Sequence, residues 1–417
     1  MHPALSKSSS RTLLHDCLRA ALRAVDGRAV VAATLRSLPV PPACPVLALG
    51  KAAPAMLAGA VDVLGERIGP SLCITREDAA RPGEPGFTGA RVLHGDHPVP
   101  GERSLAAGRQ LLAFLDALPL GAPLLCLLSG GSSALAEALP AGVSAADLGR
   151  VNRWLLGSGL PIEAVNRVRA RLSCLKAGRL AQRLAGRRVM VLAISDVPGD
   201  DPATIGSGPW TPSPAEPLPP GLPDWFDPLL DLAPPAPSPS AAGLAAVDFR
   251  VIANGVLALR AAATAAHAAG VPCTLHVAGL DGSVEAAAAE LVAAFAAGPP
   301  GLHAWSGETT MTLPAAPGVG GRNSHLALAL SVALAGASAR EGIVALCAAT
   351  DGSDGSGAGA GGWAEAAVIA RGAALGLDAG DALRRADSGA FLAATGDALC
   401  TGPTGTNVMD LVLAWRP

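Results

Sequence analysis

The chain has 417 residues, of which half are hydrophobic and 16% are charged, and its formal net charge at pH 7 is −3. Such a balance predicts no basic face for nucleic acid, and no apolar run reaches the roughly 20 residues that span a membrane. The eight cysteines form no CxxC pair, which predicts free, mostly buried thiols in a reducing, cytoplasmic compartment.

Short apolar runs alternate along the chain with longer amphipathic runs. The runs expected to be strands are 46–49, 72–75, 124–128, 189–194, 250–253, 273–277 and 342–348. The runs expected to be helices are 52–64, 104–118, 166–184, 256–269, 284–297, 325–334 and 363–375. This alternation predicts mostly parallel sheets with helices on both faces. Ligands bind at the carboxyl ends of the strands in such sheets.

Proline is concentrated in the segment 210–242, which contains PLPPGLPDWFDPLL and APPAPSPSAAG. So much proline cannot continue a helix or a central strand. We expect a linker or a long surface excursion there, with a domain boundary nearby.

A lysine stands where the first of these strands turns into a helix, in the string LGKAA around Lys51. The small neighbours and the helix N-terminus favour a bound anion such as phosphate. The chain has only three lysines among 31 basic residues. A lysine at this turn therefore indicates a site that needs a compact ammonium rather than a planar guanidinium. The alternative is a surface lysine at a tight turn. The loop is not a Walker A motif, since GxxxxGK[ST] is absent from the sequence.

A second loop of small residues, LLSGGSSAL, directly follows the apolar run 124–128. Successive small residues can aim several backbone N–H groups at one anion. Ser129, Gly130, Gly131 and Ser132 are therefore candidate phosphate ligands. An ordinary strand-to-helix turn is the alternative.

Basic residues are concentrated in VNRVRARLSCLKAGRLA. Arg169 and Lys176 lie seven positions apart, so a continuous helix would place them on one face. That face could bind an anionic substrate, or it could simply be a solvated basic surface.

Acidic residues follow the strand at 189–194, in ISDVPGDDPATIGSGP. A carboxylate at the end of a buried strand is costly unless it has a role. We expect Asp196 to hold Mg²⁺ or to accept a substrate hydroxyl proton. Turn formation is the alternative, and the pattern does not separate the two for Asp200 and Asp201.

Three further motifs lie in the C-terminal half. SGETT carries Glu308, and GVGGRN ends in Arg322, whose guanidinium suits a two-bond grip on carboxylate or phosphate. ATDGSDG carries Asp351 at another strand end, and TGPTGTN adds hydroxyls and flexible backbone. Each alone could be a hairpin tip or a turn. Glycine loops, strand-end aspartates and a few cations are together the parts of phosphoryl transfer.

These strings, in this order, resemble the bacterial glycerate 2-kinase family, whose C-terminal half is called the MOFRL domain. The strings include LGKAAPAM, HPVP, LLSGGSSAL, ISDVPGDDPATIGSGP, GVGGRN and TGPTGTN, and the resemblance runs from about Leu13 to Trp415. It implies an α/β fold. A Rossmann-like N-terminal domain with a three-layer parallel sheet is expected over 1–240, and a MOFRL domain with a mixed sheet over 241–417. The family's active site is placed in a cleft between the two.

The resemblance also implies an activity, the phosphorylation of D-glycerate at its 2-hydroxyl with ATP and Mg²⁺. Its implied catalytic residues are Lys51, Arg322 and Asp196. Its implied phosphate- or nucleotide-binding residues are Ser129, Gly130, Gly131, Ser132, Thr404, Gly405 and Asn407. Its implied substrate-binding residues are Arg169, Lys176, Glu308 and Asn323, and its implied metal ligands are Asp196, Asp201 and Asp351.

The chain departs from the family pattern at several positions, among them Ser132, Ala177, Ser306 and His325. Because His325 could alter the substrate end of the site, the departures bear on the acceptor. Two other functions therefore stay open. One is a hydroxypyruvate reductase, for which GxGxxG at Gly357, Gly359 and Gly362 is a weak nucleotide fingerprint. The other is a relative that binds ligand without turnover.

The expected partners are D-glycerate and ATP, with neither nucleic acid nor membrane, and a homodimer is one assembly consistent with the sequence. The pattern does not choose between 2-phosphoglycerate and 3-phosphoglycerate as the product.

Overall fold

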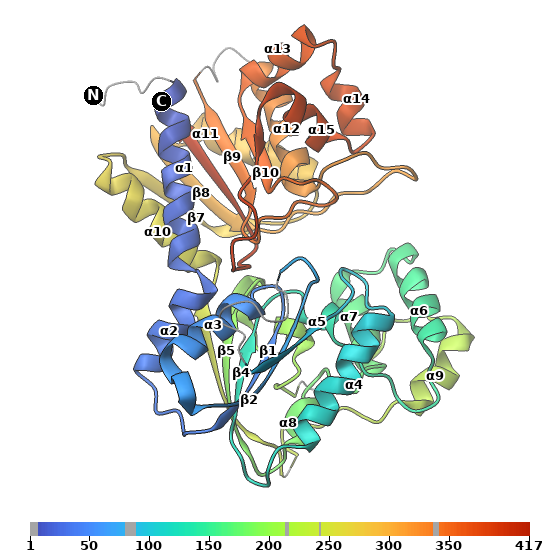
Figure 1. The fold of residues 1–417 in the computed structure, drawn as a ribbon. Coiled ribbons are helices and arrows are strands. Elements are labelled where there is room, and N and C mark those ends of the chain that lie inside the picture. Colours follow the sequence, from blue (N-terminus) through green and yellow to red (C-terminus); the bar gives the residue numbers. More distant parts are fainter. Residues whose placement is uncertain (1–6, 80–88, 213–216, 242, 337–341) are drawn as a thin grey trace. The chain divides into compact units, whose positions relative to one another are not determined.

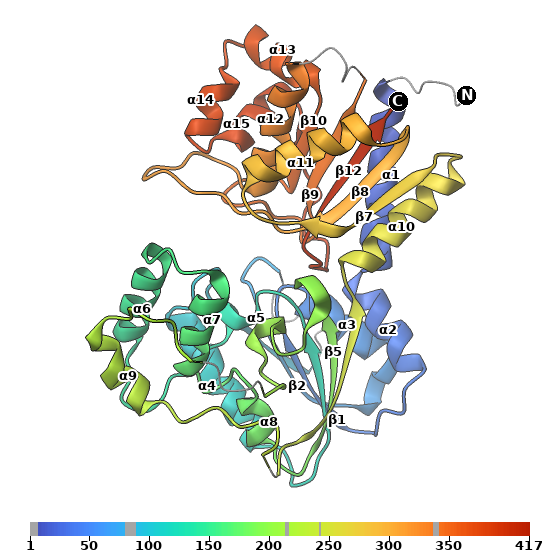
Figure 2. The ribbon, with the colours of Figure 1, turned by 180° about the vertical axis from the view of Figure 1, so that it is seen from behind.

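The computed structural model describes residues 7–79, 89–212, 217–241, 243–336 and 342–417. It divides into two compact units (Figures 1 and 2). One, the central unit, is Gly27–Ile252. The other, the terminal unit, consists of the described residues up to Asp26 together with Ala253–Pro417. Residues 213–216 and 242, which belong to the proline-rich segment, lie outside the described residues.

The central unit is built on a six-stranded sheet in the order β3-β2-β1-β4-β5-β6. Its strands are β1 (Cys44–Leu49), β2 (Ile68–Thr75), β3 (Ala90–His94), β4 (Leu124–Leu128), β5 (Arg188–Ile194) and β6 (Ala246–Ala253). β1 pairs in parallel with β2 and β4, as do β2 with β3 and β4 with β5. Strands β1 and β4 are buried along their whole length, as a parallel sheet with two covered faces requires. The expected Rossmann-like parallel sheet is confirmed.

Helices cover both faces of this sheet (Figure 1). Its helices are α2 (Gly27–Arg36), α3 (Ala53–Leu64), α4 (Glu102–Asp116), α5 (Ser132–Leu135), α6 (Ala145–Gly157), α7 (Ile162–Arg171), α8 (Arg179–Arg183) and α9 (Asp227–Leu232). Short 3₁₀ turns lie at Gly65–Arg67, Pro198–Asp200, Ile205–Ser207 and Asp224–Phe226. α3 lies against β1, β2 and β4. Leucines of α4 and α8 pack on the sheet in one core with Leu47, Leu72 and Leu124.

The helix expected over 166–184 is interrupted, so that prediction was wrong. α7 ends at Arg171, and α8 begins only at Arg179. Between them the backbone turns through left-handed conformations, with φ of 52° at Ala177 and 79° at Gly178. Lys176 therefore lies in a turn rather than on the helix face of Arg169.

The described residues of the proline-rich segment fold back onto the central unit. Phe226 and Leu230 are buried in a small core with residues of α6 and α7, among them Val151 and Leu155. The segment is thus a packed excursion and not a linker. The central unit continues through β6 to Ile252.

The terminal unit contains a second six-stranded sheet, in the order β11-β10-β9-β12-β8-β7. Its strands are β7 (Cys273–Leu280), β8 (Gly301–Gly307), β9 (Val344–Ala349), β10 (Gly361–Ala364), β11 (Ala398–Leu399) and β12 (Asp410–Arg416). β7 and β8 are parallel, whereas β12 runs antiparallel to both β8 and β9. The mixed sheet that the resemblance implied is confirmed, and the mostly parallel sheet expected from the alternation is wrong here. β10 also replaces the start of the helix expected at 363–375.

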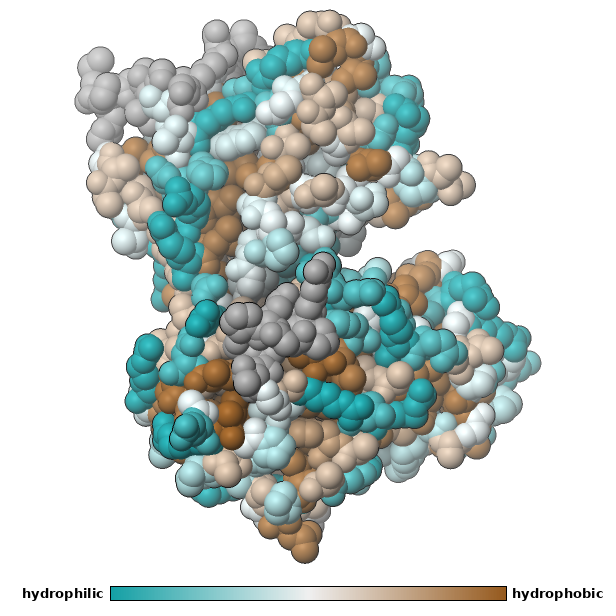
Figure 3. Space-filling model, in the orientation of Figure 1, coloured by the Kyte–Doolittle hydropathy of each residue, from teal (hydrophilic) through white to brown (hydrophobic). Residues whose placement is uncertain are grey.

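The helices of the terminal unit also lie on both faces of the sheet (Figure 2). They are α1 (Lys7–Ala24), α10 (Gly255–Ala268), α11 (Val284–Ala297), α12 (Arg322–Ala335), α13 (Ala366–Ala374), α14 (Ala379–Arg384) and α15 (Ser388–Thr395). α1 packs against α10, β9 and β12, and its outward face is hydrophilic (Figure 3). This packing puts α1 with the C-terminal part of the chain, so the compact units divide the chain differently from segments 1–240 and 241–417. Within the described residues, no helix is long and apolar enough to cross a membrane.

Candidate active site

The loops that follow β1 and β4 meet at the carboxyl end of the central sheet. β1 and β4 are neighbours at the point where the strand order reverses, and ligands bind there in sheets of this topology. The backbone N–H of Lys51 donates to the carbonyl of Gly130 at 2.9 Å. The N–H of Ala52 donates to Ser129 Oγ at 3.0 Å. The two loop motifs predicted from the sequence therefore form one structure.

Gly131, in the loop after β4, lies close to the side chains of Lys51 and His97. It has a φ of 79°, and a Cβ there would lie 3.0 Å from Lys51 Cγ and 3.3 Å from the ring of His97. The side chains of Lys51 and His97 thus both lie against this glycine. In the part of the chain that the structure describes, the backbone N–H groups of Gly130 and Gly131 have no protein acceptor. Such N–H groups beside a lysine can bind a phosphate.

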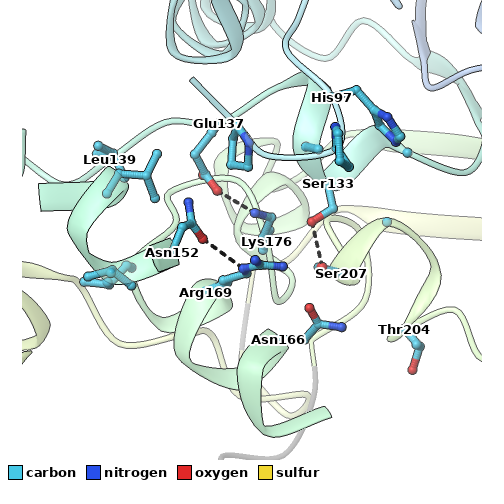
Figure 4. Close-up of a pocket in the computed structure, with 18 of the residues that line it drawn as sticks. His97, Ser133, Glu137, Leu139, Asn152, Asn166, Arg169, Lys176, Thr204 and Ser207 are labelled. Carbon is cyan, nitrogen blue, oxygen red and sulfur yellow. Dashed lines mark hydrogen bonds and ion pairs between the residues drawn. The ribbon is translucent and has the colours of Figure 1, made fainter. Parts of the chain in front are cut away.

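A cavity of about 270 Å³ opens beside this loop (Figure 4). Ser133 joins the loop to the segment after β5, because its Oγ lies 3.0 Å from Ser207 Oγ. Apolar side chains from α6, α7 and the loops beside them form part of the wall: Leu139, Leu148, Val151 and Leu172. Ser132 is buried just outside the lining, and its Oγ has no partner among the described residues.

Two cationic side chains, Arg169 and Lys176, line the cavity. Arg169 donates from Nε to Asn152 Oδ1 at 3.0 Å, and burial lowers its pKa from the ordinary value. Lys176 forms a buried ion pair in which Nζ lies 2.5 Å from Glu137 Oε2. The structure brings both predicted substrate-binding residues to one cavity. Arg169 lies on α7 and Lys176 lies in the turn after it, whereas one continuous helix was expected to contain both.

Both carboxylate oxygens of Glu137 have hydrogen-bond partners inside the protein. Its Oε1 accepts from Ser173 Oγ at 2.5 Å and from the backbone N–H of Ala138 at 2.9 Å. Its Oε2 accepts from Lys176, and both side chains of this pair are 3% exposed. The charge of Lys176 is therefore already neutralised before any ligand enters.

The two candidate metal ligands after β5 differ in their surroundings. Asp196 lines the cavity together with Thr204 and Gly206. Asp201 closes its own turn, since Oδ1 accepts from the N–H of Ala203 at 3.0 Å and Oδ2 from the hydroxyl of Thr204 at 2.9 Å. Asp201 thus has the turn-forming contacts that the sequence left open as its alternative, and Asp196 is the carboxylate at the cavity.

A second cluster lies in the terminal unit, where α12 begins beside the ends of β8 and β9. Arg322 donates from Nε to Asp410 Oδ2 at 2.5 Å and from Nη2 to Asp410 Oδ1 at 3.2 Å. Its Nη1 lies 2.6 Å from Glu308 Oε1. Burial opposes the charge of Arg322, but Asp410 and Glu308 outweigh it and raise its pKa. Burial also raises the pKa of Asp410 to about 6, in spite of Arg322.

Asp354 caps the same helix from a neighbouring loop. Its Oδ1 accepts from the N–H of Asn323 at 2.9 Å, and its Oδ2 accepts from the N–H of Ser324 at 2.7 Å. A carboxylate suits the positive end of a helix. Asn323 thereby joins the cluster through its backbone. His325, in the same first turn of α12, is buried with its Nδ1 3.2 Å from Ser388 Oγ, and burial lowers its pKa.

The remaining predicted residues of the terminal unit lie on two adjoining loops. Asp351 accepts from the N–H of Ser353 at 2.9 Å, which forms a local turn. Thr404 donates its hydroxyl to the carbonyl of Thr350, and so ties the C-terminal loop to the end of β9. Gly405 has a φ of 73°, and Asn407 is buried.

Sequence reasoning missed four residues that the site depends on, namely Glu137, Asn152, Asp354 as a cap and Asp410. Asp410 could have been identified from the sequence, because it is a lone carboxylate at the start of the apolar run DLVLAW. No group of three or more His, Cys, Asp or Glu side chains suited to a metal occurs among the described residues.

Two family models match this chain in sequence order. A model of the family described as a domain of unknown function, DUF4147, matches residues 13–217, and the MOFRL family model matches residues 302–410. A putative hydroxypyruvate reductase of Agrobacterium vitis is 35% identical over 391 residues, 88% of this chain and 98% of that protein.

Two comparisons concern proteins named as kinases. The D-glycerate 2-kinase of Thermotoga maritima is 32% identical over 379 residues, which cover 88% of this chain and 89% of that protein. The crystal structure of a glycerate kinase from Thermotoga maritima matches with a TM-score of 0.81 and 29% identity, over 97% of this chain and 99% of that one.

Proposed function

This chain belongs to the glycerate 2-kinase family, and on that premise we propose that it transfers the γ-phosphoryl group of Mg-ATP to the 2-hydroxyl of D-glycerate. The products are 2-phosphoglycerate and ADP. The observation that carries the proposal is the meeting of Lys51 with the Ser129–Gly131 loop at the β1–β4 switch point, beside a cavity that contains Arg169.

In this proposal, the phosphates lie against the loop of small residues. The N–H groups of Gly130 and Gly131 supply donors, and Lys51 offsets the negative charge that the transferring group carries. Thr404, Gly405 and Asn407 remain proposed nucleotide ligands of the terminal unit. Arg322 remains a proposed catalytic cation, although two carboxylates now hold it, so it would bind an anion only in exchange for one of them.

Glycerate occupies the cavity of the central unit in this proposal. Arg169 binds its carboxylate, and Asp196 orients the 2-hydroxyl and accepts its proton as the oxygen attacks the γ-phosphorus. The bond from that phosphorus to the bridging oxygen of ADP then breaks. Positioning and charge compensation supply most of the catalysis in such a reaction.

The carboxylates present fit a magnesium ion that arrives with ATP rather than one held in an all-protein cage. Mg²⁺ keeps several waters and binds through one or two carboxylates plus phosphate oxygens. We assign one carboxylate oxygen of Asp196, which lines the cavity, to the ion, and leave the other oxygen to accept the hydroxyl proton. When bound, the ion would neutralise phosphate charge. The eight free thiols suit a reducing compartment, and we place the reaction in the cytoplasm.

The test is an assay that couples ADP formation to added D-glycerate, with enolase as a second coupling enzyme. Enolase accepts 2-phosphoglycerate directly, so a signal without added mutase identifies the 2-isomer. Absence of ADP with D-glycerate and with related 2-hydroxy acids would overturn the kinase proposal. Nucleotide binding without any phosphoryl transfer would point instead to a non-catalytic relative.

A second function needs its own test because two relatives from Agrobacterium vitis are named putative hydroxypyruvate reductases. The GxGxxG at Gly357–Gly362 does not support it, since these residues lead into β10 rather than from a strand into a helix. Oxidation of NADH with hydroxypyruvate, measured on the same preparation, would favour this second function over the first.

A further inference from the structure

Asn152 carries a buried donor that the protein leaves without a partner. It lies on α6, is 2% exposed and lines the cavity. Its Oδ1 accepts from Arg169 Nε at 3.0 Å, which fixes the orientation of the amide because a guanidinium can only donate. Its Nδ2 has no acceptor among the described residues. Figure 4 shows the amide oxygen turned toward Arg169 and the nitrogen turned away from it.

Arg169 is the cation of this cavity whose charge remains available. Lys176 is neutralised by Glu137 within the wall, whereas no carboxylate pairs with Arg169 in the described part of the chain. Because Nε is occupied by Asn152, the two Nη groups of Arg169 are left to bind a ligand. Asn152 therefore both orients the guanidinium and adds a further N–H donor beside it.

These donors define the class of ligand. One uncompensated guanidinium together with an amide N–H matches a single carboxylate, which accepts two parallel bonds from an arginine and can take a third. The apolar side chains of Leu139, Leu148 and Val151 line another part of the same cavity. A small monocarboxylate fits this combination of charge and volume better than a dianion, which would lack a second counter-charge.

We propose that Asn152 and Arg169 form the carboxylate receptor of the cavity, and that Asn152 Nδ2 is a specificity-determining donor to a small hydroxy monocarboxylate. Lys176, held by Glu137, maintains the wall rather than binding the ligand charge. The identity of the acid, D-glycerate, rests on the proposed function. The carboxylate receptor itself is tested by ligand binding, without turnover.

Two variants distinguish the hydrogen bond that Asn152 donates to the ligand from its role in orienting the Arg169 guanidinium. Asn152→Asp keeps an oxygen that can hold Arg169 Nε but replaces the N–H donor by negative charge. Asn152→Leu has a similar volume and removes both functions. Ser144→Ala is the matched control on the same helix, because Ser144 caps α6 through the N–H of Asp147 and does not line the cavity.

The experiment measures KM for D-glycerate and for ATP, together with calorimetric titration of nucleotide-free enzyme with D-glycerate. We expect Asn152→Leu to raise KM and Kd for D-glycerate about 10- to 100-fold, which corresponds to about 1.4 to 2.8 kcal/mol. We expect Asn152→Asp to abolish measurable binding. The KM for ATP should change less than about twofold, and Ser144→Ala should keep both constants while it lowers the melting temperature.

The outcomes distinguish this inference from the kinase proposal. If the wild type phosphorylates D-glycerate and Asn152→Asp leaves its KM unchanged, the receptor is refuted while the kinase proposal stands. If the wild type binds D-glycerate without turnover and Asn152→Asp does not bind it, the receptor stands without the kinase. If the wild type binds neither D-glycerate nor L-lactate, the receptor is refuted. Glyceramide, which lacks the carboxylate charge, should bind far more weakly than D-glycerate to the wild type.

Discussion

Arg322 donates from Nε to Asp410 Oδ2 at 2.5 Å, and Asp410 lies almost fully buried at the first position of β12. Asp410 is paired across the sheet with Gly307 of β8 and with Ala349 of β9. The antiparallel strand β12 thus begins at the edge where β8 and β9 end. This topology brings a carboxylate from the end of the sequence to the first residue of α12.

Asp410 should make the stability of the terminal unit fall as pH rises through the acid range. Burial raises its pKa from 3.8 to about 6, so the native state holds the proton more tightly than the unfolded chain. The free energy of unfolding therefore declines between about pH 4 and pH 6 and stays low above that. At about 1.4 kcal/mol per pKa unit, the decline is at most about 3 kcal/mol.

Urea unfolding of the wild type and of Asp410→Asn between pH 4 and 8 measures this effect. The variant should lack the decline, so the difference between the two curves should change with pH. Asp248→Asn is the control, since Asp248 is an exposed partner of Arg250 and should leave the curve in place. Parallel curves for the wild type and Asp410→Asn would contradict the assignment.

Arg322→Lys should lower kcat strongly while the fold is kept. Arginine contacts Asp410 with two nitrogens and Glu308 with a third, and a single ammonium cannot reproduce that fork. We expect a loss of at least about 100-fold in kcat, a size typical of lost transition-state charge stabilisation. ADP formation under saturating substrates measures it, with Arg250→Lys as a surface control. A kcat within threefold of the wild type would remove Arg322 from the catalytic set.

The meeting of the loops that contain Lys51 and Ser129 could be predicted from the sequence. Lys51 and Ser129 each follow an apolar run that reads as a buried parallel strand, and parallel strands bring their carboxyl ends to one edge. The sequence could not show that β1 and β4 are neighbours, yet any doubly wound order places their ends on the same side. The local sequence pattern was therefore sufficient to predict that these two loops lie at the same edge of the sheet.

Other parts depend on tertiary contacts that leave little trace in the sequence. Asn152 lies in a stretch for which the sequence predicted no helix or strand, and only the packing of α6 on α7 brings it to Arg169. Lys176 was expected on a helix because its surroundings are helix-compatible. The helix α7 already ends at Arg171, and the left-handed backbone at Ala177 and Gly178 separates Lys176 from α8; Gly178 was the one local signal for this break.

Gly50→Ala should destabilise the central unit severely. Gly50 has a φ of 128°, and a Cβ there would lie 2.2 Å from Ser129 Oγ and 2.4 Å from the backbone oxygen of Ser129. Strained backbone and overlap with a neighbouring strand end together cost about 3 kcal/mol or more. Gly186→Ala is the matched control, because Gly186 has a φ of 76° but no atom within 4 Å of the added carbon. Gly186→Ala should lower the free energy of unfolding by only about 1 kcal/mol.

Thermal and urea unfolding compare the two glycine variants directly. The difference between them measures the contact with Ser129 together with the greater backbone strain of a φ of 128°. Equal losses of stability in the two variants would mean that the β1 and β4 loops separate easily, which would also weaken the proposed phosphate site.

Lys51→Ala should abolish turnover while the protein stays folded. The main-chain bond from the N–H of residue 51 to Gly130 does not require the lysine side chain, so the loop should keep its shape. What is lost is the side chain whose Cγ lies beside Gly131 and whose ammonium is proposed to offset phosphate charge. We expect kcat/KM to fall by at least about 1000-fold, or about 4 kcal/mol of transition-state stabilisation.

Lys51→Arg distinguishes a simple need for positive charge from a need for a compact ammonium. Gly131 leaves little room, since even a methyl group there would lie 3.0 Å from Lys51 Cγ. A guanidinium is planar and larger than an ammonium, so we expect this variant to recover less than about one tenth of the wild-type kcat/KM. The melting temperatures of both variants should stay within about 2 °C of the wild type, because exposed or half-exposed substitutions of this kind change stability little. Unchanged ADP formation in Lys51→Ala would place the catalytic charge elsewhere, and full activity in Lys51→Arg would show that charge alone is sufficient.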